Sequence, residues 1–315
     1  MATQAHISVL ARPYIEALCI DKNGRYIDAT FGRGGHTRLM LEALSDKAEV
    51  LALDRDPEAI AAGKALMEED KRFHIAYTDF ASMEAAAHAL GWSEVSGIGF
   101  DLGVSSPQLD NAERGFSFMK EGPLDMRMDF NAGEPLLKKL ERVSESRLAE
   151  VIREYGGERF AGRIARAILE RFKAGQLKTT RDLEDVCFHA MPKKKRYGST
   201  HPATRTFQAL RIWVNDEMAQ IDQAIQASIK LLKAGGRLAV ISFHSGEDRR
   251  VRDLIEQEVH GCTCPRDFPV CVCGFKPRMK WVQKKPVRAS EAEIEANPRS
   301  RSAMLRVAEK LDVSC

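Results

Sequence analysis

The sequence lacks a run of apolar residues that could cross a membrane, which would take about 20 consecutive positions. The segment Met1–Ile7 also lacks the apolar core of a secretory signal peptide. Seven cysteines are an odd number and do not suit a framework of paired disulfides. These absences argue against a membrane protein and against a secreted, disulfide-stabilised one. We therefore expect a cytoplasmic protein with reduced thiols and no membrane partner.

A strong excess of charge of one sign is also missing. The chain has 48 lysines and arginines and 45 aspartates and glutamates, which gives a formal net charge of +3. Any surface for nucleic acid must therefore be local. With 44% hydrophobic and 30% charged residues, the composition is that of an ordinary globular protein. Its 315 residues suggest two domains, or one domain with a large insertion.

The most informative stretch is an apolar segment that runs directly into a glycine-rich turn, Tyr26–His36. Glycines let the backbone approach a ligand closely, and a helix that opens after the turn directs its N–H groups at that ligand. A second strand follows and ends at Asp54, about 20 residues after the glycines. In nucleotide-binding βαβ units an acid at this separation meets a ribose hydroxyl. A plain strand, turn and helix without a ligand is the alternative.

The turn lacks the third glycine of a dinucleotide fingerprint. If the pattern G-x-G-x-x-G starts at Gly32, its last position is Thr37. This departure weakens the case for a pyrophosphate. S-adenosylmethionine carries a ribose but no phosphate, so the stretch favours that cofactor over NAD.

Four predicted strands alternate with helices in the first third of the chain. The strands cover residues 26–31, 50–56, 73–79 and 95–102, and the helices cover 6–22, 57–67 and 81–90. This alternation predicts an α/β fold with a doubly wound parallel sheet. Ligands of such sheets bind beyond the carboxyl ends of the strands, which is where His36, Asp54 and Asp101 fall.

Little strand pattern remains between residues 108 and 214. Helices are predicted at 144–155, 158–172 and 180–190, and a long helix runs from about residue 202 to residue 232. Strands resume at 235–243, 280–287 and 302–309. We therefore predict a Rossmann-like domain in two segments, 1–108 and 215–315. A mainly helical domain, 109–214, is inserted between them.

Several longer motifs together resemble one known family. They are Phe31–His36, Asp101–Asp110, Arg114–Phe118, Gly122–Asp129 and His201–Gln208, extended by Ile241–Ser245 and Asn297–Arg301. These motifs resemble those of the bacterial 16S rRNA (cytosine-N4)-methyltransferases, the RsmH or MraW type, over nearly the whole chain. The resemblance implies an S-adenosylmethionine-dependent methyltransferase sheet with an inserted substrate-recognition domain. It also implies methyl transfer to the exocyclic amine of a decoding-centre cytosine in 16S rRNA of the small ribosomal subunit.

The resemblance also implies a set of cofactor-binding residues: Gly34, Gly35, His36, Asp54, Phe80, Asp101 and Gln108. The residue types suit the cofactor. Asp54 can accept from the ribose hydroxyls, and Phe80 can lie against the adenine. Asp101 and the backbone of the glycine turn can bind the ammonium and carboxylate ends of the methionine part.

The catalytic residues are less well defined. The cytosine amine is a poor nucleophile, and it has to be positioned in line with the methyl group by groups that accept its hydrogens. The chain lacks the Asp/Asn/Ser-Pro-Pro-aromatic turn that many DNA amino-methyltransferases use for this. Asp101, Ser105 and Ser106 are the candidate acceptors, and His244 is an alternative. A hydrogen-bonded structural histidine is an equally weighted interpretation of His244.

Two features could contact RNA. Phe116 and Phe118 could flank an unstacked base, although a place in the core is the favoured interpretation. A local basic patch is formed by Lys193, Lys194, Lys195, Arg196, Arg205 and Arg211. This patch has two interpretations of about equal weight. It either contacts RNA phosphates or is a solvated loop without an RNA contact.

Four cysteines form two C-x-C pairs: Cys262, Cys264, Cys271 and Cys273. Four thiolates can bind Zn²⁺ tetrahedrally, but C-x-x-C is the commoner structural spacing. A loop of reduced thiols without metal is the favoured interpretation.

Two rival functions stay open from the sequence. A nucleotide-dependent oxidoreductase would need the glycine that Thr37 replaces. A non-catalytic RNA-binding or assembly factor would not need the intact glycine turn with Asp54 and Asp101. The sequence does not determine the oligomeric state, and a homodimer is one option.

Overall fold

The computed structural model describes residues 8–198, 200–262, 264 and 272–312. The chain divides into two compact units. The first unit comprises Met1–Gly103 and Met218–Cys315, and the second unit comprises Val104–Glu217. None of the helices in the described ranges is both long and apolar enough to cross a membrane.

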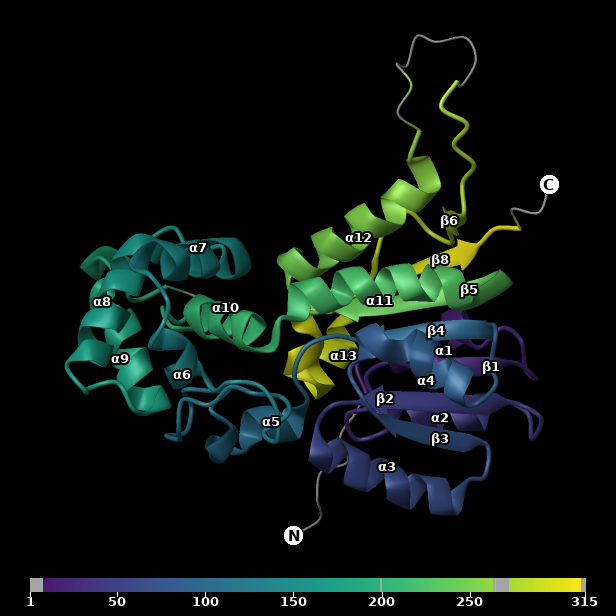
Figure 1. The fold of residues 1–315 in the computed structure, drawn as a ribbon, viewed down its shortest axis with the longest axis horizontal. Coiled ribbons are helices and arrows are strands. Elements are labelled where there is room, and N and C mark those ends of the chain that lie inside the picture. The colour runs from purple at the N-terminus through teal and green to yellow at the C-terminus, as the bar shows by residue number, and fades with distance from the viewer. Residues whose placement is uncertain (1–7, 199, 263, 265–271, 313–315) are drawn as a thin grey trace. The chain divides into compact units, whose positions relative to one another are not determined.

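The first unit is built on one eight-stranded sheet in the order β3-β2-β1-β4-β5-β8-β6, with β7 paired to β8 (Figure 1). The strands β1 to β5 run parallel, and β8 runs antiparallel to β5. Their bounds are β1 (Arg25–Asp28), β2 (Glu49–Asp54), β3 (Phe73–Tyr77), β4 (Val95–Asp101), β5 (Leu232–Ser242), β6 (Met279–Trp281), β7 (Val287–Arg288) and β8 (Met304–Lys310).

Helices cover both faces of this sheet because successive strand residues point to opposite faces. Ile27 and Leu51 belong to a core with α4, α11 and α12, whereas Tyr26 and Val50 belong to a core with α1, α2 and α3. The fold is therefore the predicted doubly wound α/β sheet. The helices are α1 (Ala11–Leu18), α2 (Gly35–Ala43), α3 (Pro57–Glu69), η1 (Phe80–Ser82), α4 (Met83–Ala89), α11 (Glu217–Leu231), α12 (Ser245–His260), α13 (Glu291–Ala296) and η4 (Pro298–Ser302).

The strand order reverses between β1 and β4. From β1 the chain passes to β2 and β3 on one side, whereas β4 and β5 lie on the other. In open α/β sheets the crevice at this reversal, beyond the carboxyl ends of the strands, binds ligands. The glycine turn after β1 and Asp101 at the end of β4 meet there.

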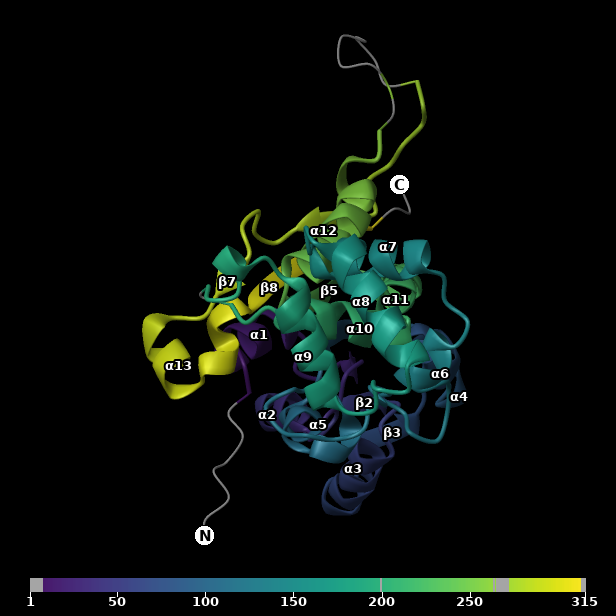
Figure 2. The same cartoon turned by 90° about the vertical axis from the view of Figure 1, so that its left-hand side faces the viewer.

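The second unit is mainly helical (Figure 2). Within it, α7 packs against both α8 and α10, and α8 packs against α9. Leu148 and Ile152 on α7, and Ile164 and Ile168 on α8, are fully buried four residues apart, as expected for amphipathic helices. Its helices are α5 (Ser106–Asp110), η2 (Ala112–Arg114), α6 (Leu136–Leu140), α7 (Glu145–Gly156), α8 (Ala161–Lys173), α9 (Thr180–Ala190), η3 (Lys193–Lys195) and α10 (Thr204–Asn215).

Two predicted elements are wrong in extent. The long helix from residue 202 to residue 232 is two helices, α10 and α11, separated at Asp216. Asp216 has φ of 53°, a left-handed conformation that ends a helix, and its N–H donates to Ile212 O. The predicted strand 280–287 is two short strands, β6 and β7, which pair with different parts of β8.

Candidate functional site

The glycine turn joins β1 to α2 at the carboxyl edge of the sheet. Gly34 is the residue before α2, and its φ of 76° is a conformation that favours glycine. A Cβ at Gly34 would come within 2.8 Å of the Phe31 ring, so a side chain has no room there. The Gly34 N–H donates to Phe31 O at 2.8 Å and closes the turn. The first N–H groups of α2, which have no partner within the helix and no side-chain cap at Gly34, therefore lie at the carboxyl edge of the sheet.

Gly35 is needed for a different reason. A Cβ at this position would lie 2.2 Å from Ser8 Oγ, in the segment that precedes α1. The next residue of that segment, Val9, accepts a hydrogen bond from His36 Nε2 at 2.9 Å. Gly35 therefore makes room for the chain's own segment before α1. The sequence predicts that the glycines of this turn make room for a ligand, whereas at Gly35 the space is taken by Ser8.

His36 lies in the first turn of α2 and has 6% of its surface exposed. Its Nδ1 lies 3.4 Å from Asp101 Oδ2, and the Tyr14 ring packs against the imidazole at a centroid distance of 4.6 Å. Burial lowers the pKa of His36, but the hydrogen bond and the charge of Asp101 outweigh it, so the pKa lies above its ordinary value. The 3.4 Å approach of His36 Nδ1 therefore orients the Asp101 carboxylate.

Asp101 ends β4 and faces the glycine turn. Its N–H donates to Thr30 Oγ1 at 2.6 Å, which ties the end of β4 to the end of β1. Its Oδ2 faces His36, but its Oδ1 is buried and has no hydrogen-bond partner within the described residues. A buried carboxylate oxygen without a donor is costly. The arrangement suits a ligand that supplies a donor, above all a charged one.

Asp54 ends β2 and holds the glycine turn from the other side. Its Oδ2 accepts from Gly32 N at 2.7 Å, and its Oδ1 accepts from Asp56 N at 2.8 Å. Burial raises the pKa of Asp54 to about 6, although these backbone N–H groups act in the opposite direction. Each oxygen keeps a second lone pair, so the carboxylate can still accept from hydroxyl groups of a ligand.

Thr37 replaces the third glycine of the dinucleotide pattern, and the structure gives it a role that sequence reasoning missed. Its hydroxyl donates to Asp28 Oδ2 at 2.5 Å, and both residues are fully buried. Thr30 N donates to the other oxygen, Asp28 Oδ1, at 3.2 Å. This pair fixes the start of α2 on the end of β1. An aspartate inside the apolar segment 26–31 was the signal that could have revealed it.

Phe80 forms the first residue of η1, next to the end of β3. It is half-buried, and its ring stands edge-on to Phe100 at a centroid distance of 5.8 Å. The Asp79 side chain accepts from Ser82 N at 3.0 Å and fixes this short helix. Phe80 is thus held at the carboxyl edge, as the sequence predicts.

His244 is placed as a helix cap. Its Nδ1 accepts from Glu247 N at 3.3 Å at the start of α12. Glu247 Oε1 lies 2.9 Å from His244 Nε2, but the two atoms are not aligned for a hydrogen bond. Because Nδ1 accepts, a neutral His244 carries its proton on Nε2. This geometry favours the structural interpretation over that of a proton acceptor.

Ser105, Ser106 and Gln108 belong to the second unit. Ser105 and Gln108 form a capping box at the start of α5, in which the Ser105 N–H donates to Gln108 Oε1 at 2.9 Å. Ser106 is the first residue of the same short helix. The capping box gives Ser105 and Gln108 a structural role, and their parts in catalysis and cofactor binding stay predictions.

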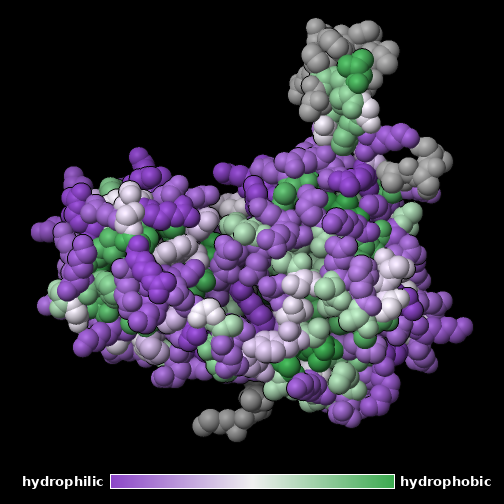
Figure 3. All heavy atoms as spheres, viewed as in Figure 1, coloured by the Kyte–Doolittle hydropathy of each residue, from purple (hydrophilic) through white to green (hydrophobic). Residues whose placement is uncertain are grey.

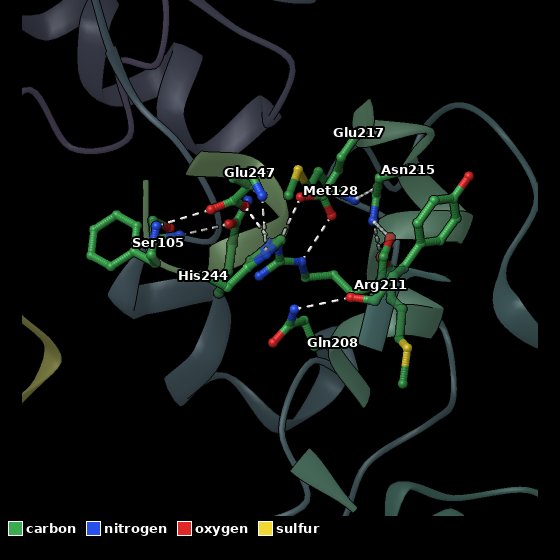
Figure 4. A network of polar contacts seen from close by, with 12 residues as sticks. Ser105, Met128, Gln208, Arg211, Asn215, Glu217, His244 and Glu247 are labelled. Carbon is green, nitrogen blue, oxygen red and sulfur yellow. Dashed lines mark hydrogen bonds and ion pairs between the residues drawn. The ribbon is translucent and has the colours of Figure 1, made fainter. Parts of the chain in front are cut away.

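Arg211 belongs to the basic patch for which phosphate contact and a solvated loop are both open, but its side chain is paired within the second unit. Its guanidinium forms two hydrogen bonds of 2.8 Å with Glu217, and the two side chains are 13% and 4% exposed (Figure 4). The neighbouring Asn215 side chain donates to Met126 O and to Arg211 O, and accepts from Met128 N. These contacts tie the end of α10 to the segment before α6 and make Arg211 structural.

Three other candidate RNA contacts also have partners within the second unit, and for Phe116 and Phe118 a place in the core is the interpretation that the sequence favours. Phe116 is 6% exposed in the core of the second unit, so it is not available to a base in this structure. Phe118 is half-buried and stacks on His201 at a centroid distance of 4.7 Å. Arg196 donates to Met191 O and His189 O, which anchors the loop after α9.

The exposed part of the predicted patch is smaller than the sequence suggested. Lys193, Lys194 and Lys195 form η3 and are exposed, as is Arg205 on α10. Tyr197 is 85% exposed and stands edge-on to Phe188, a feature that the sequence analysis missed. An aromatic residue next to a basic run was the signal.

Comparisons with known proteins agree with this geometry. The family model described as "MraW methylase family" matches residues 3–311. A protein from Idiomarina loihiensis named "Ribosomal RNA small subunit methyltransferase H" is 48% identical over 309 residues, which cover 97% of each chain. A protein of the same name from Geobacter sp. (strain M21) is 47% identical over 307 residues, covering 97% of this chain and 98% of that one. A solved rRNA methylase from Streptococcus thermophilus covers 95% of this chain and 92% of that one at 12% identity and a TM-score of 0.40, a likeness too distant to carry an argument.

Proposed function

Because the chain belongs to the MraW methylase family, we propose that it transfers a methyl group to the N4 amine of a decoding-centre cytosine in 16S rRNA. The enzyme is an S-adenosylmethionine-dependent methyltransferase of small-subunit ribosomal RNA. The observation that carries the assignment of the site is the buried Asp101 Oδ1, which lacks a donor at the point where the strand order reverses.

The residues at the carboxyl edge fit S-adenosylmethionine. The ammonium group of the cofactor supplies the charged donor that Asp101 Oδ1 lacks. The N–H groups at the start of α2 suit its carboxylate, and Asp54 suits its ribose hydroxyls. Phe80 offers an aromatic ring for the adenine. A pyrophosphate is a poorer fit, because Thr37 fills the place of the third glycine and uses its hydroxyl on Asp28.

When bound, the cofactor supplies a methyl group attached to a sulfonium. Transfer of this methyl group is favourable without a further energy source. The task of this chain is to position the cytosine amine and to accept its hydrogens. Asp101 is the best-placed acceptor in the first unit, since one oxygen is oriented by His36 and the other is unpartnered. Ser105 and Ser106 are further acceptors, and Gln108 is a further cofactor contact.

The second unit is proposed to recognise the rRNA. Its exposed Lys193, Lys194, Lys195 and Arg205 suit phosphate groups, and Tyr197 offers a ring for an unstacked base. We place the reaction in the cytoplasm. The pairing of two copies into a homodimer stays a prediction.

Methyl incorporation tests this proposal. Unmodified 16S rRNA, free and assembled into small subunits, is incubated with the enzyme and labelled S-adenosylmethionine, then digested to nucleosides for mass spectrometry. We expect the label in N4-methylcytidine. Label in another nucleoside, or none with either substrate, would contradict the proposal.

The Asp101→Asn variant tests the site itself. If Asp101 acts in the transition state, kcat stays about 10²-fold or more below that of the wild type at saturating cofactor and RNA. Full turnover at saturation would restrict Asp101 to cofactor binding. Lys173→Gln, an exposed change at the end of α8 outside the predicted RNA contacts, is the control that keeps the cofactor site intact.

A further inference from the structure

The chain between α12 and β6 forms a loop whose two ends are fastened together. Arg278 N donates to Glu258 O at 2.9 Å, and the Arg278 guanidinium makes two hydrogen bonds of 2.6 Å to the Glu258 carboxylate. Just beyond, a Cβ on Gly261 would lie 2.6 Å from the Phe275 ring, so the outgoing and returning segments pack closely. The loop therefore starts and ends at one place on the first unit.

Three thiols converge within this loop. The Sγ atoms of Cys262, Cys264 and Cys273 all lie within 4.8 Å of one another. Cys262 Sγ and Cys273 Sγ are 3.6 Å apart, and Val272 N donates to Cys264 Sγ at 3.3 Å. The sequence brings Cys262 and Cys273 together across ten intervening residues, so their approach is a property of the fold and not of sequence adjacency. Cys271, the remaining thiol of the two C-x-C pairs, lies outside the described residues.

The spacing of these sulfur atoms suits a metal ion better than a disulfide. A disulfide joins its sulfur atoms at about 2.05 Å, far shorter than 3.6 Å. Thiolates around one tetrahedral Zn²⁺, each about 2.3 Å from the metal, lie about 3.8 Å apart.

The described residues of the loop pack little apolar surface against the rest of the first unit. Figure 3 shows hydrophobic residues, in green, at the surface of its described part, and Val272 is 72% exposed. None of its described cysteines is buried, and no described residue of the loop beyond Gly261 belongs to one of the hydrophobic cores. The described residues of its two arms therefore contribute little apolar burial to offset the entropy of ordering the chain. A metal ion that links its two arms supplies the missing constraint.

We propose that Cys262, Cys264 and Cys273 are thiolate ligands of a structural Zn²⁺ ion that holds this loop closed. The site is structural because it lies far from the crevice. The helix α12 begins just after the carboxyl end of β5 and runs for 16 residues, about 24 Å, before the loop starts. Zinc binding therefore goes beyond the proposed methyl transfer and does not depend on it. The C-x-C spacing alone favours thiols without a metal, and the approach of the three sulfur atoms in the fold is the observation that favours zinc.

The test measures metal in the full chain, purified without a metal-binding tag or chelator and with its thiols kept reduced. Inductively coupled plasma mass spectrometry is expected to find about one zinc per chain. In Cys262→Ala and Cys273→Ala the zinc content is expected to fall at least tenfold after gel filtration. Cys19→Ala, which removes a buried thiol elsewhere in the first unit, is expected to keep its zinc.

A second measurement keeps the test independent of how well the variants fold. Zinc-free wild-type chain titrated with Co²⁺ is expected to develop thiolate-to-cobalt charge-transfer absorption, which added Zn²⁺ abolishes. S-adenosylhomocysteine binding, measured on the same samples, reports whether the cofactor site is intact. Wild-type chain that neither holds zinc nor gives this absorption would overturn the proposal, as would equal zinc in Cys262→Ala and Cys19→Ala. Iron in place of zinc would overturn the identity of the metal.

Discussion

At the carboxyl edge of the first unit, Asp101 keeps one buried oxygen without a donor, whereas Arg211 in the second unit directs its guanidinium at Glu217. Asp101 lies within one of the family's motifs, and Arg211 follows another of them, His201–Gln208, by three residues. The first arrangement leaves a buried acceptor that a ligand with a hydrogen-bond donor can satisfy. The second is satisfied internally by the chain's own residues.

The same contrast holds for the neighbours of these residues. In the first unit, Asp54 holds the glycine turn through Gly32 N, and His36 orients the carboxylate of Asp101. In the second unit, Ser105 caps a helix and Phe116 lies in the core. A residue within a family motif is therefore not evidence of ligand contact. The motifs of the second unit serve largely to build the scaffold that presents other, exposed side chains.

The largest effect is expected from breaking the internal pair of the second unit. Arg211→Met leaves the Glu217 carboxylate buried without its partner, which lowers the free energy of unfolding by about 3–5 kcal/mol. Chemical denaturation followed by circular dichroism measures it. Arg205→Met, an exposed change on the same helix, is expected to stay within about 0.5 kcal/mol of the wild type. Equal losses in the two variants would remove the distinction between internal and exposed arginines.

The next effect concerns the first unit. Asp54→Ala removes the acceptor for the ribose hydroxyls and is expected to weaken cofactor binding by about 1.5–3 kcal/mol, roughly 10- to 150-fold. Calorimetry with S-adenosylhomocysteine measures it, and circular dichroism checks that the fold survives. Because Asp54 also holds Gly32, part of the loss reflects a looser turn. Unchanged affinity would remove Asp54 from the site.

The pH dependence of cofactor affinity sharpens this assignment. Burial raises the pKa of Asp54 to about 6, so the free enzyme protonates this carboxyl below that pH. A protonated carboxyl accepts hydrogen bonds from the ribose hydroxyls less well than a carboxylate does. The affinity for the cofactor is therefore expected to fall by up to about tenfold per pH unit as the pH drops from 6 toward 4.5. In Asp54→Asn this step is expected to disappear. A step near pH 6 that persists in Asp54→Asn would assign it to another group.

The smallest effect is expected at the surface of the second unit. Charge reversal of Lys193, Lys194 and Lys195 to glutamate weakens rRNA binding and lowers the slope of log affinity against log salt by about 2–3. Cofactor affinity stays unchanged. Binding to 16S rRNA fragments at several salt concentrations measures the slope. An unchanged slope would mean that η3 is only a solvated turn.

Local patterns predicted much of the first unit. The alternation of apolar strands and helices, and the glycines before α2, are features of neighbouring residues, so they can be recognised without the fold. The break at Asp216 could not be predicted, because an aspartate in a left-handed conformation has no distinctive neighbours. The contacts of Asn215 with Met126 and Met128 could not be predicted either, because they join residues that lie 89 and 87 positions apart. The same is true of the contact between Gly35 and Ser8, which only the folded chain brings together.

The most direct test of the account is the difference between two cofactor fragments. S-adenosylhomocysteine carries the ammonium that Asp101 Oδ1 is proposed to bind, and 5′-methylthioadenosine lacks it. Calorimetry on the wild type and on Asp101→Asn is expected to show at least about tenfold weaker binding of S-adenosylhomocysteine in the variant, the scale of a hydrogen bond to a charged group. Binding of 5′-methylthioadenosine is expected to change less than about twofold, since that ligand makes no such bond. Equal losses for the two ligands, or no loss for either, would contradict the claim that the unpartnered oxygen of Asp101 marks the cofactor site.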